Sequence, residues 1–311
     1  MIKAYYDGGI YIELDNVTLL ADPLSYPRRR VDVILISHAH ADHYNLNTLL
    51  KTHNIPKIMS NITYDLIASG KRLRNVHLVR PGEIIEISGV TIEALEAGHI
   101  LGSLQFAIHG RRTVVYTGDI NLERRVILKP ATIARADVLI IEATYGKEDY
   151  SFPPRSELYR SLLVMVKEHR DRGKPLQLRA RRLGVAQELT ALLALSGFAL
   201  PLVHPSIERY NRFYEEKGVS LGPYAVAIEA EIPEPIIVPL NSSRRGLPCT
   251  GWAAKWLKGL PISSHSGFDK LVKYALESGA EKVYTVYGFS RELASYLSSE
   301  GLDAEPLPRR A

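Results

Sequence analysis

The segment that decides the fold is Ile36-Ser37-His38-Ala39-His40-Ala41-Asp42-His43, which ends the apolar run over residues 31–37. The run suits a strand buried on both faces. The segment places three of the chain's ten histidines and one aspartate within six residues. Imidazole and carboxylate groups bind Zn²⁺ and similar ions at about 2.0–2.2 Å, and a polar surface turn gives no reason to crowd them. The segment therefore predicts a metal site at the end of a buried strand.

Two later segments offer further metal ligands. His99 stands between glycines in Glu96-Ala97-Gly98-His99-Ile100-Leu101-Gly102-Ser103, and Asp119 ends Val115-Tyr116-Thr117-Gly118-Asp119. Taken singly, a hydrogen-bonded loop histidine and a turn-forming aspartate are equally good interpretations. The ordered set favours ligands. We expect a first ion on His38, His40 and His99, a second on Asp42 and His43, and Asp119 as the bridge between them.

Asp22 follows an early strand in Leu19-Leu20-Ala21-Asp22-Pro23. A carboxylate at this point can accept a hydrogen bond from a ligand histidine and so orient its ring. A turn or cap role suits it nearly as well.

Length and composition limit the class of protein. A chain of 311 residues predicts two domains, or one large fold with an insertion. The net charge of +5 leans toward a polyanionic partner. The lone Cys249 cannot form an internal disulfide or a thiolate metal cage, which favours a reducing, cytoplasmic location over a catalytic cysteine. We expect no membrane segment, because the longest apolar run, 189–203, is interrupted and too short.

The hydrophobic pattern changes character near residue 147. The first part reads as short strands, expected over residues 10–14, 17–21, 31–37, 90–95, 104–109, 113–117 and 138–142. Strands at 175–179 and 200–203 then alternate with helices at 156–169, 184–195 and 206–217, which is typical of a parallel α/β unit. The tail predicts a strand, a helix, a strand and a helix over residues 262–265, 268–277, 282–286 and 291–300.

We therefore predict a metal-binding domain over 1–146, an inserted α/β domain over 147–261, and a return to the first domain over 262–311. Residues 147–261 contain 17 Lys and Arg against 12 Asp and Glu, whereas the rest contains 22 of each. The whole positive excess thus falls in the expected insert.

Four segments, LLADP, SHAHADH, AGHILGS and TGD, resemble in order the motifs of the metallo-β-lactamase superfamily. The AGHxxGS form, followed by Ile141-Glu142-Ala143-Thr144-Tyr145-Gly146, is similar to the β-CASP nucleases, which process RNA 3′ ends or trim DNA. The resemblance implies an αββα sandwich with an inserted α/β domain, and it assigns Glu142 to the family's first extra acidic motif. Gly184-Val185-Ala186-Gln187-Glu188 is similar to the GxxQE helix start of the insert, and Cys249-Thr250-Gly251-Trp252-Ala253 resembles its end.

The second extra motif of that family resembles Ser264-His265-Ser266-Gly267. The resemblance implies that His265 lies above the metals, where a histidine paired with Glu142 can protonate a leaving oxygen at neutral pH. The alternative is a helix-capping neighbourhood built on the two serines.

The third extra motif departs from the pattern. Relatives that act on RNA carry a histidine before glycine, as a ligand of the second ion, whereas this chain has Tyr287 before Gly288. A phenol with a pKa of about 10 is a poor zinc ligand, so we expect a weaker second site.

Arginines precede the expected helix at Gly184. Arg179, Arg181 and Arg182 could meet a phosphate together with the free N–H groups of that helix, or form an ordinary solvated loop. Arg28, Arg29 and Arg30 are further candidates for contact with a nucleic-acid backbone.

The sequence thus predicts a metal-dependent nuclease that hydrolyses DNA or RNA phosphodiesters, working from an end. Its cofactors would be two divalent metal ions, with Zn²⁺ preferred and Mn²⁺ as the alternative metal. Its partner would be nucleic acid. Two alternatives stay open: a metallo-hydrolase of small esters or thioesters, and a degenerate nuclease that only binds nucleic acid.

Overall fold

The computed structural model describes residues 2–227, 233–243, 245–255 and 258–310. The chain divides into two units. The first, here the sandwich unit, contains Met1–Leu122, Pro130–Lys147 and Phe268–Ala311. The second, the insert unit, contains Glu123–Lys129 and Glu148–Gly267. We predicted domain boundaries at 1–146, 147–261 and 262–311. These boundaries stay a prediction, because two compact units need not be two domains that fold independently.

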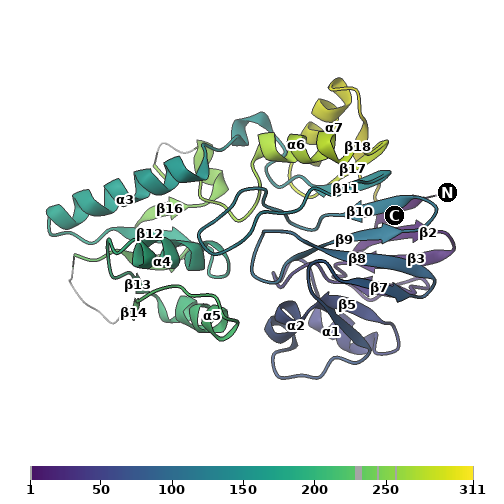
Figure 1. Ribbon diagram of the computed structural model, residues 1–311, viewed down its shortest axis with the longest axis horizontal. Helices are drawn as coiled ribbons and strands as arrows, with labels where there is room; N and C mark the ends of the chain where they lie inside the picture. Colours follow the sequence, from purple (N-terminus) through teal and green to yellow (C-terminus); the bar gives the residue numbers. More distant parts are fainter. Residues whose placement is uncertain (1, 228–232, 244, 256–257, 311) are drawn as a thin grey trace. The chain divides into compact units, whose positions relative to one another are not determined.

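Two sheets face each other in the sandwich unit (Figure 1). Alternate residues of β2, Ile10, Ile12 and Leu14, join Phe106 and Ile108 of β9 in one buried cluster, as expected when one face of each strand meets a core. The first sheet has the order β1-β2-β3-β4-β5-β6. Its strands are β1 Lys3–Tyr6, β2 Ile10–Leu14, β3 Val17–Ala21, β4 Val33–Leu35, β5 Lys57–Ser60 and β6 Val76–Val79.

The second sheet has the order β18-β17-β11-β10-β9-β8-β7. Its strands are β7 Ile84–Ile87, β8 Val90–Glu96, β9 Leu104–His109, β10 Thr113–Tyr116, β11 Val138–Glu142, β17 Lys282–Val286 and β18 Asp303–Pro306. Its outer face buries Val115, Leu139 and Val283 against Leu271 of helix α6 (Phe268–Ser278) and Leu293 of helix α7 (Ser290–Ser299).

Two short helices, α1 (Leu46–Lys51) and α2 (Asn61–Ala68), lie beside β5 (Figure 1). Together with α6 and α7 on the second sheet they give the expected αββα order of layers, so the predicted fold class is confirmed.

The insert unit is built on a parallel sheet with the order β14-β13-β15-β12-β16. Its strands are β12 Gln177–Ala180, β13 Leu202–Val203, β14 Ala225–Val226, β15 Ile236–Pro239 and β16 Leu247–Cys249, and its helices are η1 Glu148–Tyr150, α3 Arg155–Asp171, α4 Val185–Leu195, α5 Pro205–Glu216 and η2 Gly251–Lys255. Apolar residues of α3, α4, α5 and the sheet share one core. The predicted parallel α/β unit is confirmed.

Several predicted secondary-structure elements differ from those in the structure. The strand expected at 262–265 is wrong: the Ser263 hydroxyl accepts a hydrogen bond from the backbone N–H of His265 at 3.0 Å, and such local bonds compete with a ladder. The strand expected at 31–37 is shortened to β4. The sequence analysis did not predict helices α1 and α2, although each begins with a capping residue. Asn45 accepts a hydrogen bond from Thr48 N at 3.1 Å, and Ser60 accepts one from Thr63 N at 2.9 Å.

A buried charge cluster fastens the short segment Glu123–Lys129 to the rest of the insert unit. Glu188 of α4 accepts from Arg125 at 3.1 Å, and Arg155 of α3 approaches it at 3.5 Å. The hydroxyl of Tyr159 also donates to Glu188. The side chains of Glu188 and Arg125 have no exposed surface. The acidic residue of the GxxQE segment therefore neutralises two buried guanidinium groups.

We expect Glu188→Gln to lower the free energy of unfolding by about 3–5 kcal/mol, because it removes a buried carboxylate charge that both Arg125 and Arg155 contact. Urea unfolding followed by tryptophan fluorescence measures this. The matched control is Glu157→Gln, since Glu157 is an exposed residue in the first turn of α3. Equal stability of the two variants would contradict a stabilising role for the cluster.

Candidate metal centre

Loops that follow three strands of the sandwich unit bring the four candidate ligands together. His38 and His40 follow β4 of the first sheet, whereas His99 follows β8 and Asp119 follows β10 of the second. All four side chains are buried. The two sheets therefore contribute jointly to one site at one end of the sandwich.

The donor atoms of these four residues converge. His40 Nδ1 lies 3.1 Å from His38 Nε2 and 2.9 Å from His99 Nε2. Asp119 Oδ2 lies 3.4 Å from His38 Nε2 and 3.5 Å from His99 Nε2. Ligands held at 2.0–2.1 Å around a tetrahedral ion are separated by about 3.3 Å. The described residues thus fit a four-coordinate divalent ion, as the sequence predicts.

His43 stands beside this group. Its Nε2 lies 3.3 Å from Asp119 Oδ2, and its Nδ1 lies 2.7 Å from Asp22 Oδ2. Burial lowers the pKa of His43, but the Asp119 and Asp22 carboxylates outweigh that effect and raise the pKa well above its usual value. The surroundings of this ring therefore favour positive charge.

The Asp22 carboxylate is the common acceptor behind the centre. Its Oδ1 accepts from the backbone N–H of Ser37 at 2.7 Å, and its Oδ2 accepts from the Ser37 hydroxyl at 2.5 Å. Oδ2 also accepts from the Tyr116 hydroxyl at 2.7 Å and faces His43 Nδ1. Ser37 Oγ in turn lies 3.0 Å from His38 Nδ1, so Asp22 orients one ligand ring directly and another through a serine.

Gly118 lets the Asp119 loop approach this network. Gly118 has φ +53°, and a Cβ at this position would lie 2.6 Å from the Cβ of Ser37. Any side chain would push the loop away from the strand that carries His38. The sequence Thr117-Gly118-Asp119 therefore combines a ligand with the close approach that the ligand requires.

Tyr287 ends β17 next to His43. The two rings meet edge to face at 5.2 Å, and the Tyr287 hydroxyl lies 3.5 Å from that of Tyr116. Tyr287 has φ +65°, which is unusual for a bulky residue and marks strain at a functional site. Burial and the Asp22 carboxylate raise the pKa of Tyr287 well above its usual value. Both effects favour the protonated phenol, which can donate a hydrogen bond.

The other predicted residues are distributed differently. Glu142 is buried at the end of β11, where its carboxylate accepts from Ile120 N at 2.7 Å and lies within 4.8 Å of Asp119. Asp42 is exposed and stands outside the ligand groups found among the described residues. His265 belongs to the insert unit, two residues before its boundary at Gly267. The roles of Asp42, Glu142 and His265 stay predictions.

The predicted phosphate-binding arginines have protein partners. Arg179 donates to the Leu240 carbonyl at 3.1 Å, and Arg182 is exposed with its guanidinium 3.5 Å from Asn241. Arg181 is partly buried. The α4 N-terminus is also occupied, because Gln187 Oε1 accepts from Gly184 N at 2.7 Å. Nucleic-acid binding by these arginines stays a prediction.

Sequence reasoning missed Ser37 and Tyr116 as supports of the centre. Each of these two residues adjoins a recognised motif. Its hydrogen bond to Asp22, however, depends on which strands lie next to each other or face each other, and no local sequence pattern indicates this. Burial raises the pKa of Cys249 to about 12, in agreement with the expectation that it is no nucleophile. Among the described residues, no helix combines the length and apolar character needed to cross a bilayer.

Comparison with known proteins places this site in a family. Residues 14–190 match the beta-lactamase superfamily domain. The chain is 28% identical over 305 residues to a probable DNA ligase of Opitutus terrae, covering 90% of this chain and 29% of that protein. It is 29% identical over 230 residues to RNase aCSPSF2 of Saccharolobus solfataricus, covering 65% of this chain and 46% of that protein. The chain thus spans less than half the length of these curated relatives.

A crystal structure of a protein of unknown function from Enterococcus faecalis has the same fold, with a TM-score of 0.62, 13% identity and coverage of 99% of this chain and 96% of that one. The ordered ligand set, the sandwich with its insert and the family match agree. The chain therefore belongs to the metallo-β-lactamase superfamily, and its homologues are the β-CASP nucleases of that superfamily.

Proposed function

We propose that this protein is a metal-dependent nuclease that hydrolyses phosphodiester bonds from an end of DNA or RNA. The observation that carries the proposal is the convergence of four buried donor atoms, from His38, His40, His99 and Asp119, in a chain whose homologues are nucleases. A small-ester hydrolase would use the same ligands, but the basic insert gives a reason to prefer a polyanionic substrate.

We assign the first ion, Zn²⁺ by the preference of histidine and carboxylate ligands, to those four residues. A second ion would be shared by His43, Asp42 and Asp119, with Mn²⁺ as an alternative metal. A bound divalent ion supplies a water whose pKa falls toward about 7 and neutralises negative charge on the phosphate. Tyr287 offers a neutral phenol at the place of a further ligand, which supports a weaker second site.

We assign proton transfer to His265 and Glu142. A histidine supplies a proton near neutral pH, so His265 would protonate the departing sugar oxygen while Glu142 holds the imidazole in the correct tautomer. The Glu142 carboxylate is fixed by the backbone of Ile120, which suits an orienting role.

DNA is the first substrate to test, because the relative that matches 90% of this chain is a probable DNA ligase, and RNA is the second because of RNase aCSPSF2. The single cysteine and a centre built without thiolates suit work in the reducing cytoplasm. Metal-analysed protein is incubated with single-stranded DNA and RNA labelled at the 5′ or the 3′ end. Shortening of either polymer from one end is expected. Hydrolysis of model esters with no effect on oligonucleotides would refute the proposal.

We expect His40→Ala to abolish both tight metal binding and cleavage, because it removes the donor that lies nearest to two other ligands. Elemental analysis of dialysed protein and the oligonucleotide assay measure the two effects. His53→Ala is the matched control, since His53 is an exposed histidine of the same unit. Retention of wild-type metal content by His40→Ala would exclude the assigned site.

We expect Asp22→Asn to weaken metal binding by about 10–100-fold, because an amide orients the His43 and Ser37 groups less well than a carboxylate does. Competition with a chromogenic chelator measures the dissociation constant. Asp65→Asn, a change on the surface of α2, serves for comparison. An unchanged dissociation constant for Asp22→Asn would show that the network is dispensable.

We expect Tyr287→His to increase the number of tightly bound ions, because an imidazole replaces a neutral phenol beside His43. Titration calorimetry of the metal-free protein measures the stoichiometry. Tyr287→Phe, which keeps the ring and removes the hydroxyl, should leave the stoichiometry unchanged. If wild-type protein binds but never cuts oligonucleotides and Tyr287→His gains cleavage, the protein is a degenerate nuclease.

A further inference from the structure

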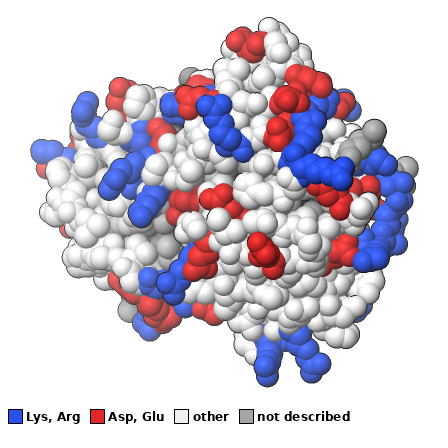
Figure 2. All heavy atoms as spheres, turned by 45° about the vertical axis from the view of Figure 1, so that its right-hand side comes forward, with Lys and Arg blue, Asp and Glu red and all other residues white. Residues whose placement is uncertain are grey.

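Exposed cations gather at the β1 edge of the sandwich unit. We call this surface the basic edge; it consists of Lys3, Arg28, Arg29, Arg30, Arg309 and Arg310. Figure 2 shows Lys and Arg side chains collected toward the right-hand side of the view, with acidic side chains between them. The metal-ligand loops and the arginines of the insert unit do not contribute to the basic edge.

The chain beyond β18 brings Arg309 and Arg310 to this edge. Tyr6 of β1 donates from its backbone N–H to the Pro308 carbonyl at 2.8 Å, and Arg310 N donates to the Tyr6 carbonyl at 3.0 Å. The segment thus pairs with β1 through its backbone. A substitution of either side chain leaves these hydrogen bonds in place.

Tyrosine rings position the arginines. The guanidinium carbon of Arg309 lies 5.7 Å from the centre of the Tyr6 ring, and that of Arg310 lies 5.1 Å from the Tyr5 ring. Tyr5 stacks on Tyr11 at 5.1 Å with nearly parallel planes. Cations held over aromatic faces are partly preorganised, which lowers the entropy cost of binding an anion.

The loop after Asp22 adds the other arginines. The backbone N–H of Arg28 donates to the Tyr11 hydroxyl, and the charge of Arg29 acts on both Tyr5 and Tyr11. Arg30 is paired with Asp32 at 3.0 Å, while its side chain remains 88% exposed. The same loop presents Tyr26, 55% exposed, as an aromatic face next to this run of arginines.

The basic edge continues toward the metal centre through two tyrosines. Tyr6 lies beneath the guanidinium group of Arg309. Tyr287 in turn meets His43 edge to face at 5.2 Å. Tyr6 and Tyr287 both pack on the core between the two sheets.

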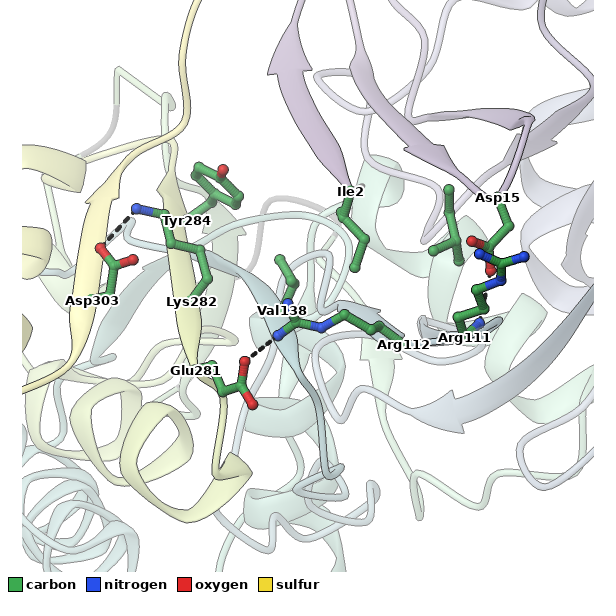
Figure 3. A pocket seen from close by; sticks show the side chains of 10 residues that line it. Ile2, Asp15, Arg111, Arg112, Val138, Glu281, Lys282, Tyr284 and Asp303 are labelled. Carbon is green, nitrogen blue, oxygen red and sulfur yellow. Dashed lines mark hydrogen bonds and ion pairs between the residues drawn. The ribbon is translucent and has the colours of Figure 1, made fainter.

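A cavity of about 430 Å³ is lined by Leu14 at the end of β2, Lys282 at the start of β17 and Asp303 at the start of β18. Its charges differ from those of the basic edge. Two of its cations are paired with carboxylates: Arg112 with Glu281, and Lys282 with Asp303 at 2.8 Å (Figure 3). These two ion pairs reduce the attraction of the cavity for a polyanion. In the basic edge, by contrast, Arg30 pairs with Asp32, whereas Arg309 and Arg310 lie over tyrosine rings.

We propose that the basic edge binds the single-stranded part of the nucleic-acid substrate, with phosphates on Arg309, Arg310 and Arg29 and an unpaired base stacked on Tyr26. The proposal rests on the proposed function and extends it by a second contact surface outside the metal centre. Charged grooves that carry an aromatic platform are the usual means of holding single strands without reading their sequence.

The test measures binding of metal-loaded protein to short, fluorescent phosphorothioate DNA and RNA strands, which resist hydrolysis, by anisotropy between about 50 and 200 mM salt. We expect Arg309→Ser/Arg310→Ser to weaken binding and to lower the slope of log K against log salt by about 1.4, the value for two lost phosphate contacts on a single strand. Tyr26→Ala should weaken binding about fivefold or more with the slope unchanged.

The matched control is Lys71→Ser/Arg72→Ser, which removes two exposed cations between α2 and β6, at the opposite edge of the same sheet. Its affinity and slope should equal those of the wild type. Arg309→Lys/Arg310→Lys keeps the charge and should keep the slope. Thermal unfolding of each variant verifies that it is folded. A loss confined to DNA or to RNA would identify the ligand of the basic edge.

Hydrolysis of a small phosphodiester by the wild-type protein separates this inference from the proposed function. If the wild type hydrolyses the small diester but Arg309→Ser/Arg310→Ser retains the wild-type slope, or the two control cations matter equally, the inference is overturned and the proposed function stands. If the slope falls as expected but neither diesters nor oligonucleotides are hydrolysed, the proposed function fails and the binding surface stands.

Discussion

The Asp22 carboxylate is the point on which the metal centre depends. It is buried between the two sheets and accepts hydrogen bonds from Ser37 at the end of β4 and from Tyr116 at the end of β10, while it faces His43. One acidic group thus fixes the relative position of the strand ends that carry the ligands. A buried carboxylate is costly unless its lone pairs are satisfied, so the same hydrogen bonds that orient the ligands also make the charge tolerable. The geometry of the candidate ligands therefore depends on the same hydrogen bonds that allow Asp22 to be buried in the core.

The sequence predicted the parts of the fold and site that have a local signal. Short apolar segments located β2, β3, β9 and β11, and the motifs singled out in the sequence contain the four side chains whose donor atoms converge, His38, His40, His99 and Asp119. It failed where the outcome depends on distant partners. Residues 262–265 were expected to form a strand, yet the Ser263 hydroxyl accepts a hydrogen bond from His265 N and the chain bends at residues 264–265. The support that Tyr116 gives to Asp22 arises only when β10 and β3 lie in facing sheets.

The net charge of a segment does not show where its charged side chains lie on the surface. The residues outside the expected insert have equal numbers of acidic and basic side chains, yet the sandwich unit concentrates exposed arginines along one edge and pairs Arg112 and Lys282 with carboxylates elsewhere. Counting by segment cannot find such a surface, because Arg28–Arg30 and Arg309–Arg310 are separated by nearly the whole chain. Backbone pairing between Tyr6 and Arg310 brings them together.

The cluster around Glu188 has a consequence for how the protein can be divided. The chain passes between the two units four times, because the seven residues Glu123–Lys129 belong to the insert unit although they are flanked by the sandwich unit. A fragment cut at the two main boundaries would lose Arg125 and expose half of a buried ion pair. The insert is thus no removable module, and a chimera that exchanges it between relatives must carry the seven-residue segment with it.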